Sequence, residues 1–244
     1  EVDVQFNSGR WQVLSMPELD RLNINAAEVE VLMDSLILKD FIMAPGALLN
    51  GTLKTIVFSG QFLMEKNATT SNSLDLVFSG TNGVYQDLQE VEGFSLFNRG
   101  VNLNIQSSGA FETLDLSGET NLLIQQTSVK NLVLSEDAQL ILTDGSTLSV
   151  VETIVNENSL GGAGLIRSSG KAYFYHDLYN KYCFQGLSVE NVDLLGEAVI
   201  NLDPQSTVVN AANWSNISCE DVIFVNFEVR FNCAGGITEF INLS

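Results

Sequence analysis

The sequence predicts an all-β protein, a right-handed parallel β-helix (β-solenoid) with capped ends. Three observations predict this fold: apolar pairs with strand periodicity, self-similarity at about 17 to 22 residues, and a scarcity of proline. Only 3 of the 244 residues are proline, as expected where each residue of a ladder uses its backbone N–H. Crossovers between parallel strands are almost always right-handed, which sets the expected hand of the coil.

The strand signal is a repeated apolar–x–apolar pair. Leu132/Leu134 and Leu140/Leu142 are two such pairs, and their spacing has the two-residue period of a strand, not the period of a helix. The segment after the second pair, 143–146, reads Thr-Asp-Gly-Ser, and these residue types favour turns. We therefore expect each unit to contain two or three short strands joined by polar corners, making one circuit (a rung) of a coil.

The repeat is clearest at an offset of 60 residues. The segments 129–148 and 189–208 match at ten positions without a gap, and they place Leu132 opposite Val192 and Leu140 opposite Ile200. Shorter matches at offsets of 18 and 20 set the length of one unit, so that 60 corresponds to three units. One rung cannot bury its own apolar stripe, whereas neighbouring rungs bury each other's stripes.

Two other folds fit part of the pattern. Phe111-x-x-Leu114-x-Leu116 suits the strand of a leucine-rich repeat, but that fold returns through a helix or 3₁₀ segment, and here a second strand-like pair, Leu122/Ile124, follows. A jelly roll or immunoglobulin-like sandwich also suits closely spaced strands. The self-match at 60 residues favours the β-helix over both.

The ends of a solenoid expose unpaired backbone and core, so something must cover them. We expect residues 1–212 to form the β-helix, including an N-terminal cap that contains Trp11. Residues 213–244 hold Trp214 and an alternating apolar stretch, and they are predicted to form a C-terminal cap or the start of a further module. Because the chain begins with Glu1, we expect a trimmed chain, a mature N-terminus left after removal of a signal peptide, or a fragment of a longer protein.

Charge and hydropathy exclude some partners. The 30 acidic and 11 basic residues give a net charge of −19, which repels nucleic acid and anionic lipid headgroups. The longest apolar stretch, 41–49, is interrupted by Pro45 and Gly46. It is much shorter than the roughly 20 residues of a membrane span, so we expect neither nucleic-acid binding nor a transmembrane segment.

Catalytic chemistry is not predicted, and no catalytic residue is assigned. Polysaccharide lyases and hydrolases need clustered carboxylates, or a carboxylate beside Arg or Lys, and the 11 basic residues are scattered along the chain. We therefore predict that the protein is not an enzyme. Acidic corners such as Asp137 and Asp144 are candidate calcium ligands, but no EF-hand loop is present and no metal is assigned.

Two segments that depart from the repeat carry the candidate binding and covalent features. Residues 173–184, YFYHDLYNKYCF, break the strand pattern. Aromatic faces can stack on sugar rings or on a partner protein, or fill a core. The candidate ligand-binding residues are Tyr173, Tyr175, Tyr179 and Tyr182. Farther along, Cys219 and Cys233 lie 14 positions apart and are a candidate disulfide, which would fit an oxidising compartment.

The segment 148–166, LSVVETIVNENSLGGAGLI, resembles the short β-helical repeats of large secreted, adhesin-like surface proteins of Bacteroidota, many of them cargo of type IX secretion. Asp34-Ser35-Leu36 is similar to the short O-glycosylation signal of that group, whereas the C-terminal sorting domain of the longest members is not visible. The resemblance implies a secreted or cell-surface location and a role in adhesion. We therefore expect a structural or adhesive β-helix module that contacts a surface glycan or another surface protein. The alternative is a β-helix that binds or cleaves carbohydrate.

Overall fold

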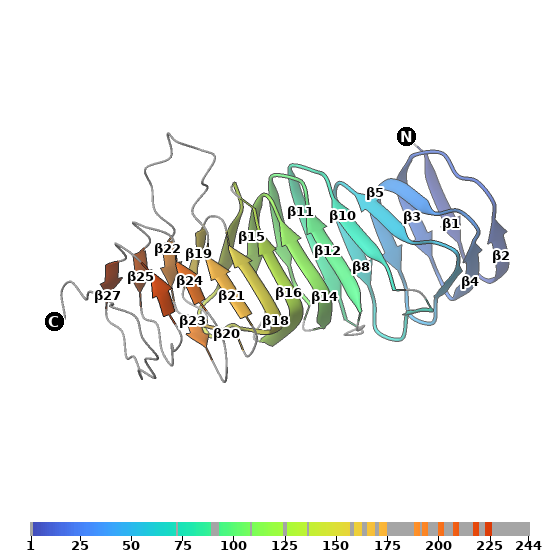
Figure 1. Cartoon of the computed structure of the whole chain (residues 1–244). Coiled ribbons are helices and arrows are strands. Elements are labelled where there is room, and N and C mark those ends of the chain that lie inside the picture. The colour runs from blue at the N-terminus through green and yellow to red at the C-terminus, as the bar shows by residue number, and fades with distance from the viewer. Residues whose placement is uncertain are drawn as a thin grey trace. The chain divides into compact units, whose positions relative to one another are not determined.

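The protein is described by a computed structural model of residues 1–244. The structure describes residues 2–71, 73–88, 93–107, 109–123, 126–135, 137–156, 159–162, 165–168, 171–174, 188–190, 192–194, 200–202, 207–209, 217–219 and 223–225. Within these residues every regular element is a β-strand, and every strand pair with a defined register is parallel. The parallel strands stack as a β-solenoid (Figure 1), which confirms the predicted all-β parallel solenoid and removes the leucine-rich repeat and the antiparallel sandwich. The right-handed coil and the capped ends stay predictions.

The chain divides into two compact units, Glu1–Thr113 (unit 1) and Leu114–Ser244 (unit 2). The strands of unit 1 are β1 (Asp3–Phe6), β2 (Gly9–Val13), β3 (Leu19–Ile24), β4 (Ala27–Val31), β5 (Ser35–Met43), β6 (Leu48–Gly51), β7 (Thr55–Phe58), β8 (Gln61–Met64), β9 (Thr69–Thr70), β10 (Asp75–Phe78), β11 (Asn82–Asp87), β12 (Phe94–Asn98) and β13 (Asn102–Ile105). The strand β14 (Ala110–Leu116) spans the boundary.

The strands of unit 2 are β15 (Glu119–Leu122), β16 (Gln126–Leu134), β17 (Gln139–Leu142), β18 (Thr147–Asn156), β19 (Ser159–Gly162), β20 (Leu165–Ser168), β21 (Lys171–Phe174), β22 (Ser188–Glu190), β23 (Val192–Leu194), β24 (Ile200–Leu202), β25 (Thr207–Val209), β26 (Ile217–Cys219) and β27 (Ile223–Val225).

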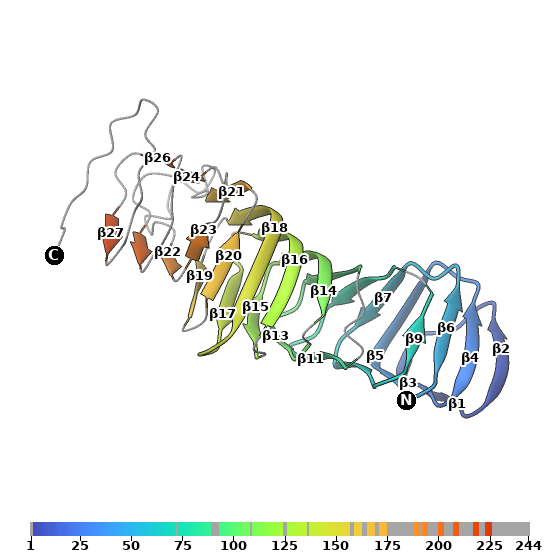
Figure 2. The ribbon, with the colours of Figure 1, turned by 90° about the horizontal axis from the view of Figure 1, so that it is seen from below.

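The described strands of unit 1 form three sheet faces. The long strand β5 serves two of them, since residues 35–38 pair with β7 and residues 41–43 pair with β8. The first face continues through β10 and β12, and the second through β11 and β13. A separate four-stranded sheet, β2-β4-β6-β9, forms the third face (Figure 2).

The register places inward side chains directly above one another. On the first face, Ile56, Leu76 and Leu96 follow one another at intervals of 20 residues and are 0% exposed. On the second face the interval varies, from 18 between Val4 and Leu22 to longer steps farther along. A rung of about the predicted length is therefore confirmed, and alternation of buried and outward residues gives each strand its two-residue period.

The residues that match at an offset of 60 do not stack on one another, because they lie on different faces of the solenoid. Leu132 lies in a column whose next in-register positions are Ile154, Ala172 and Ile200. Val192, the predicted equivalent of Leu132, instead lies in the column of Leu148. Every face carries the same kind of apolar pair, so a sequence match cannot distinguish a strand from its counterpart on the neighbouring face.

The residues expected to cap the ends include strands of the coil itself. Trp11 lies on β2, which pairs in parallel with β4, and its ring packs 5.4 Å from that of Phe6. It is 49% exposed, whereas Val29, the next position in its column, is fully buried. In the segment 213–244, β26 and β27 extend the ladders of β24 and β25. The rest of that segment lies outside the described residues.

No helix of the described chain has the length and apolar character that crossing a membrane requires.

Candidate binding groove

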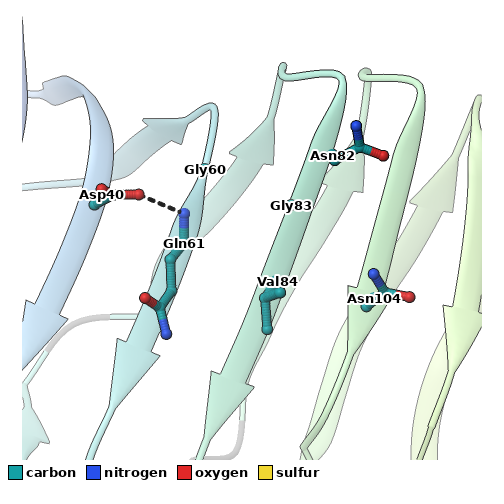
Figure 3. Close-up of a pocket in the computed structure, with 7 residues that line it drawn as sticks. All are labelled: Asp40, Gly60, Gln61, Asn82, Gly83, Val84 and Asn104. Carbon is teal, nitrogen blue, oxygen red and sulfur yellow. Dashed lines mark hydrogen bonds between the residues drawn. The ribbon is translucent and has the colours of Figure 1, made fainter.

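An open groove of about 360 Å³ lies on the outer surface of the second face of unit 1. Its walls and floor come from β5, β8, β11 and β13 and from the corner between β7 and β8 (Figure 3). The residues that line it are Asp40, Gly60, Gln61, Asn82, Gly83, Val84 and Asn104. We call this the amide groove.

Strand alternation makes these side chains point outward. Phe62 and Tyr85 align in register and are buried in the core. Gln61 and Val84, which immediately precede them, therefore project from the opposite side of the sheet. Asn104 is in register with Val84 and continues the same outward column. The groove thus follows a column of positions that runs across the strands, from one rung to the next.

Two glycines form the floor of the amide groove. A Cβ atom at Gly60 would collide with the carboxylate of Asp40, and one at Gly83 would overlap the ring of Phe78. The Phe78 ring thus occupies the space that a side chain at Gly83 would need. A side chain at Gly60 would displace the carboxylate of Asp40, which lines the groove. A side chain at Gly83 would instead point into the core and displace the ring of Phe78.

Asp40 is the charged side chain of the groove. Its Oδ1 accepts a hydrogen bond of 2.9 Å from the backbone N–H of Gln61 (Figure 3). Its Oδ2 lies 3.5 Å from Nη2 of Arg21, in an ion pair. Bonds to an ionised acceptor are stronger than those between neutral groups, so two partners on neighbouring rungs hold this carboxylate in a defined orientation.

The amides of Gln61, Asn82 and Asn104 supply most of the hydrogen-bonding capacity. Within the described part of the chain, none of these three side-chain amides has a hydrogen-bond partner. Each carries an acceptor oxygen and an NH₂ group with two donors. Gln61 on β8 and Asn104 on β13 flank Val84 in one column, two strand spacings or about 10 Å apart, and Asn82 lies two residues before Val84 on β11. The groove therefore presents three groups of donors and acceptors that the protein itself does not use.

Polar groups are also buried on the inner side of β11. Tyr85 is buried, and burial raises the pKa of its phenol well above the ordinary value. The nearby charge of Asp87 raises this pKa further, while a hydrogen bond with Ser107 lowers it. Asp87 and Ser107 are each 1% exposed. This cluster stabilises the neutral phenol inside the core and does not open into the amide groove.

The residues of the groove suit binding by hydrogen bonds. Asp40 is the single acidic side chain of the lining. In the described ranges no three His, Cys, Asp or Glu residues gather closely enough to hold a metal ion. The candidate calcium ligands Asp137 and Asp144 are exposed at corners of unit 2.

The tyrosines and cysteines named from the sequence fall largely beyond the described ranges. Tyr173 lies on β21, where its backbone is in register with Val155 and Asn201. Tyr175, Tyr179 and Tyr182 lie outside the described residues, so ligand binding by the tyrosines stays a prediction. Cys219 is on β26 and Cys233 is outside the described residues, so their disulfide also stays a prediction.

Sequence reasoning missed the amide groove. Its polar residues are ordinary outward residues of strands, and no local motif marks them. One signal was available, because Phe-Ser-Gly occurs at 58–60 and again at 78–80, 20 residues apart. That repeat locates a corner with little side-chain volume next to β8, but it does not specify which amides lie beside the corner.

Comparison with known proteins gives no relative from which a function could be taken. No protein-family model matches the chain, no curated protein matches it, and no solved structure matches it.

Proposed function

We propose that this chain is a structural or adhesive β-helix module of a large secreted cell-surface protein. One observation supports the proposal: strands of successive rungs pair in parallel register. Their backbone hydrogen-bonding groups are therefore used within the solenoid. Outward side chains are then free to make contacts without changing the fold, as in other solenoids that present extended binding surfaces.

The charge of the chain supports a location where solubility and display matter. A net charge of −19 keeps a molecule soluble and discourages binding to nucleic acid or anionic lipid. The partner of the module is a glycan or another protein on a cell surface.

The location is tested by labelling intact cells that produce the protein with an antibody raised against the purified chain. Surface display predicts labelling without permeabilisation and loss of the signal after mild external proteolysis. Labelling that requires permeabilisation would contradict surface display.

Adhesion is tested by immobilising the purified chain and measuring the attachment of cells, with heat-unfolded chain as the control. Attachment should be saturable, should depend on the folded chain and should be inhibited by added soluble chain. If folded and unfolded chain retain the same number of cells, the adhesive role is wrong.

The amide groove favours carbohydrate binding as a second candidate function. Amides and an oriented carboxylate are suited to hydrogen-bonding sugar hydroxyls. Cleavage of carbohydrate is tested separately, by measuring the reducing ends that the chain releases from a panel of polysaccharides. A binding module releases none, and catalytic release would favour the carbohydrate-cleaving alternative.

A further inference from the structure

The unused hydrogen bonds of the amide groove indicate the kind of ligand it takes. Gln61 and Asn104 offer donors and acceptors on either side of Val84 in one column across three strands, and Asn82 offers more two residues away on β11. A ligand that satisfies all three amides must carry several groups that both donate and accept hydrogen bonds. Sugar hydroxyls have this property, because each one can do both.

The backbone of the groove argues against a peptide in extended conformation. Peptides that add to a sheet do so through the free backbone groups of an edge strand. Here β11 is paired on one side with β8 and on the other with β13, so its backbone groups are already used. A ligand must bind through side chains, from above the sheet.

Charge restricts the ligand further. The carboxylate of Asp40 lines the groove, and its cationic partner Arg21 is already engaged with it. The chain as a whole carries a charge of −19, which repels sulfate and carboxylate groups. Sulfated and uronic-acid polysaccharides are therefore disfavoured, and neutral glycans are not.

The direction and size of the groove set how the ligand lies. The column of Gln61, Val84 and Asn104 crosses the strands from rung to rung, so a chain that contacts all of it runs along the axis of unit 1. The volume of about 360 Å³ is at the lower end of the roughly 300–1,000 Å³ typical of small-ligand sites. It suits a short oligosaccharide segment.

We propose that the amide groove binds a short segment of a neutral glycan, laid along the axis of unit 1, with its hydroxyl groups bonded to Gln61, Asn82 and Asn104. Asp40 accepts a further hydrogen bond from the sugar. This inference rests on the proposed adhesive function and identifies both the ligand class and the residues that bind it.

The first experiment is an array of neutral, sulfated and uronic-acid polysaccharides probed with the purified chain. Binding to neutral members is expected, with little dependence on salt, because no ionic contact is involved. Selective binding to sulfated or uronic-acid members would overturn the ligand class.

The second experiment measures affinity for the best neutral glycan after Gln61→Ala, Asn104→Ala and their combination. Removing either amide should raise Kd about fivefold, since a hydrogen bond contributes about 0.5–1.5 kcal/mol. The double variant should raise Kd more than tenfold. Asn82→Asp preserves the shape while replacing the NH₂ donors with charge, and it should also weaken binding. Circular dichroism and thermal unfolding check that every variant is folded.

Gln139→Ala is the matched control, because Gln139 is an exposed amide on β17 of unit 2; it should bind like the unaltered chain. If the folded groove variants also bind the glycan unchanged, the groove is not the site, while adhesion through another surface still stands. If the unaltered chain binds neither glycans nor cells, the groove inference and the adhesive function both fail.

Discussion

The cores of the two units use different side chains on the same backbone pattern. In unit 1 the rings of Phe41 and Phe62 stack with centroids 5.1 Å apart, and those of Phe62 and Tyr85 stack at 5.3 Å. Among the described side chains of unit 2, the buried apolar residues are all aliphatic: Leu114, Leu116, Leu122, Val129, Leu132, Leu134, Ala138, Leu140, Leu142, Leu148, Val150, Ile154 and Ile166.

The difference shows what the ladder determines and what it leaves open. Parallel register determines which way a side chain points, whereas its size must be matched by neighbours on other rungs and faces. In unit 1 the large ring of Phe78 packs where Gly83 and Gly100 lack side chains. The size of one core side chain is thus matched by glycines about 5 and 20 positions away in the sequence. Aromatic and aliphatic side chains can therefore both fill the core of the same kind of coil.

The largest expected effect comes from truncating one buried residue in each unit. Phe62→Ala should destabilise the fold by about 3–5 kcal/mol and Leu140→Ala by about 2–5 kcal/mol. The loss at Phe62 should be the greater, because its ring packs against those of Phe41, Phe58 and Tyr85. Urea unfolding followed by circular dichroism measures both. A larger loss at Leu140 would show that the ring contacts of unit 1 add little beyond burial.

A second pair of substitutions separates close packing from backbone strain. Gly83→Ala in unit 1 forces the Phe78 ring to move and should cost about 1–3 kcal/mol. Gly145 in unit 2 has open space around it but a φ of +76°, so Gly145→Ala should cost about 1 kcal/mol through conformation alone.

Each cause has its own rescue. Phe78→Leu combined with Gly83→Ala should recover part of the loss in unit 1, because the smaller side chain makes room for the new methyl group. Gly145→Asn should be milder than Gly145→Ala, because asparagine tolerates positive φ. Urea midpoints would show both, and a Phe78→Leu change that deepens the loss at Gly83 would contradict the packing argument.

The buried phenol of unit 1 should make stability depend on alkaline pH. An unfolded tyrosine loses its proton near pH 10, whereas the raised pKa of Tyr85 keeps the folded phenol neutral. This contribution to stability is therefore complete below about pH 10 and is lost as the pH rises toward the folded pKa.

Tyr85→Phe tests this dependence. It should cost about 1 kcal/mol at neutral pH, through the hydrogen bond with Ser107, and should reduce the loss of stability above about pH 10. Urea midpoints from pH 8 to 11 for both proteins provide the comparison. If the urea midpoints of the two proteins differ by the same amount at every pH, Tyr85 does not cause the alkaline loss of stability.

The smallest effect is expected at an exposed ion pair of unit 1. Lys54 Nζ lies 3.1 Å from Asp34 Oδ1, but the two side chains are 74% and 78% exposed. Solvent screens such a pair, so Lys54→Ala should change the free energy of unfolding by less than about 0.5 kcal/mol. A loss above about 1 kcal/mol would show that surface charge contributes to the difference between the units.

The sequence was sufficient to predict the solenoid because the coil repeats a local signal. The pairs Leu132/Leu134 and Leu140/Leu142, which predicted strands, are buried as expected. It was not sufficient to assign columns, because Val192 and Ile200 belong to similar apolar pairs on different faces.

The amide groove was harder to predict because it is assembled from distant residues. Asp40, Gln61 and Asn104 are brought together from three rungs, and the ring of Phe78 explains the bare backbone at Gly83. None of these relations can be read within a window of a few residues. The groove can be predicted only when the register between strands is known. If one strand is assigned to the wrong face, the residues of the groove no longer lie together.

The register beyond β21 has a practical consequence for protein engineering. Ile154 and Ala172 are 18 positions apart, yet Ala172 and Ile200, which are also neighbours in register, are 28 apart. Closing a longer loop adds little entropy cost, so the stacking of strands persists across a longer connection. A rung of this solenoid could therefore be lengthened by about ten residues (28 − 18 = 10) while the parallel register of its strands is kept.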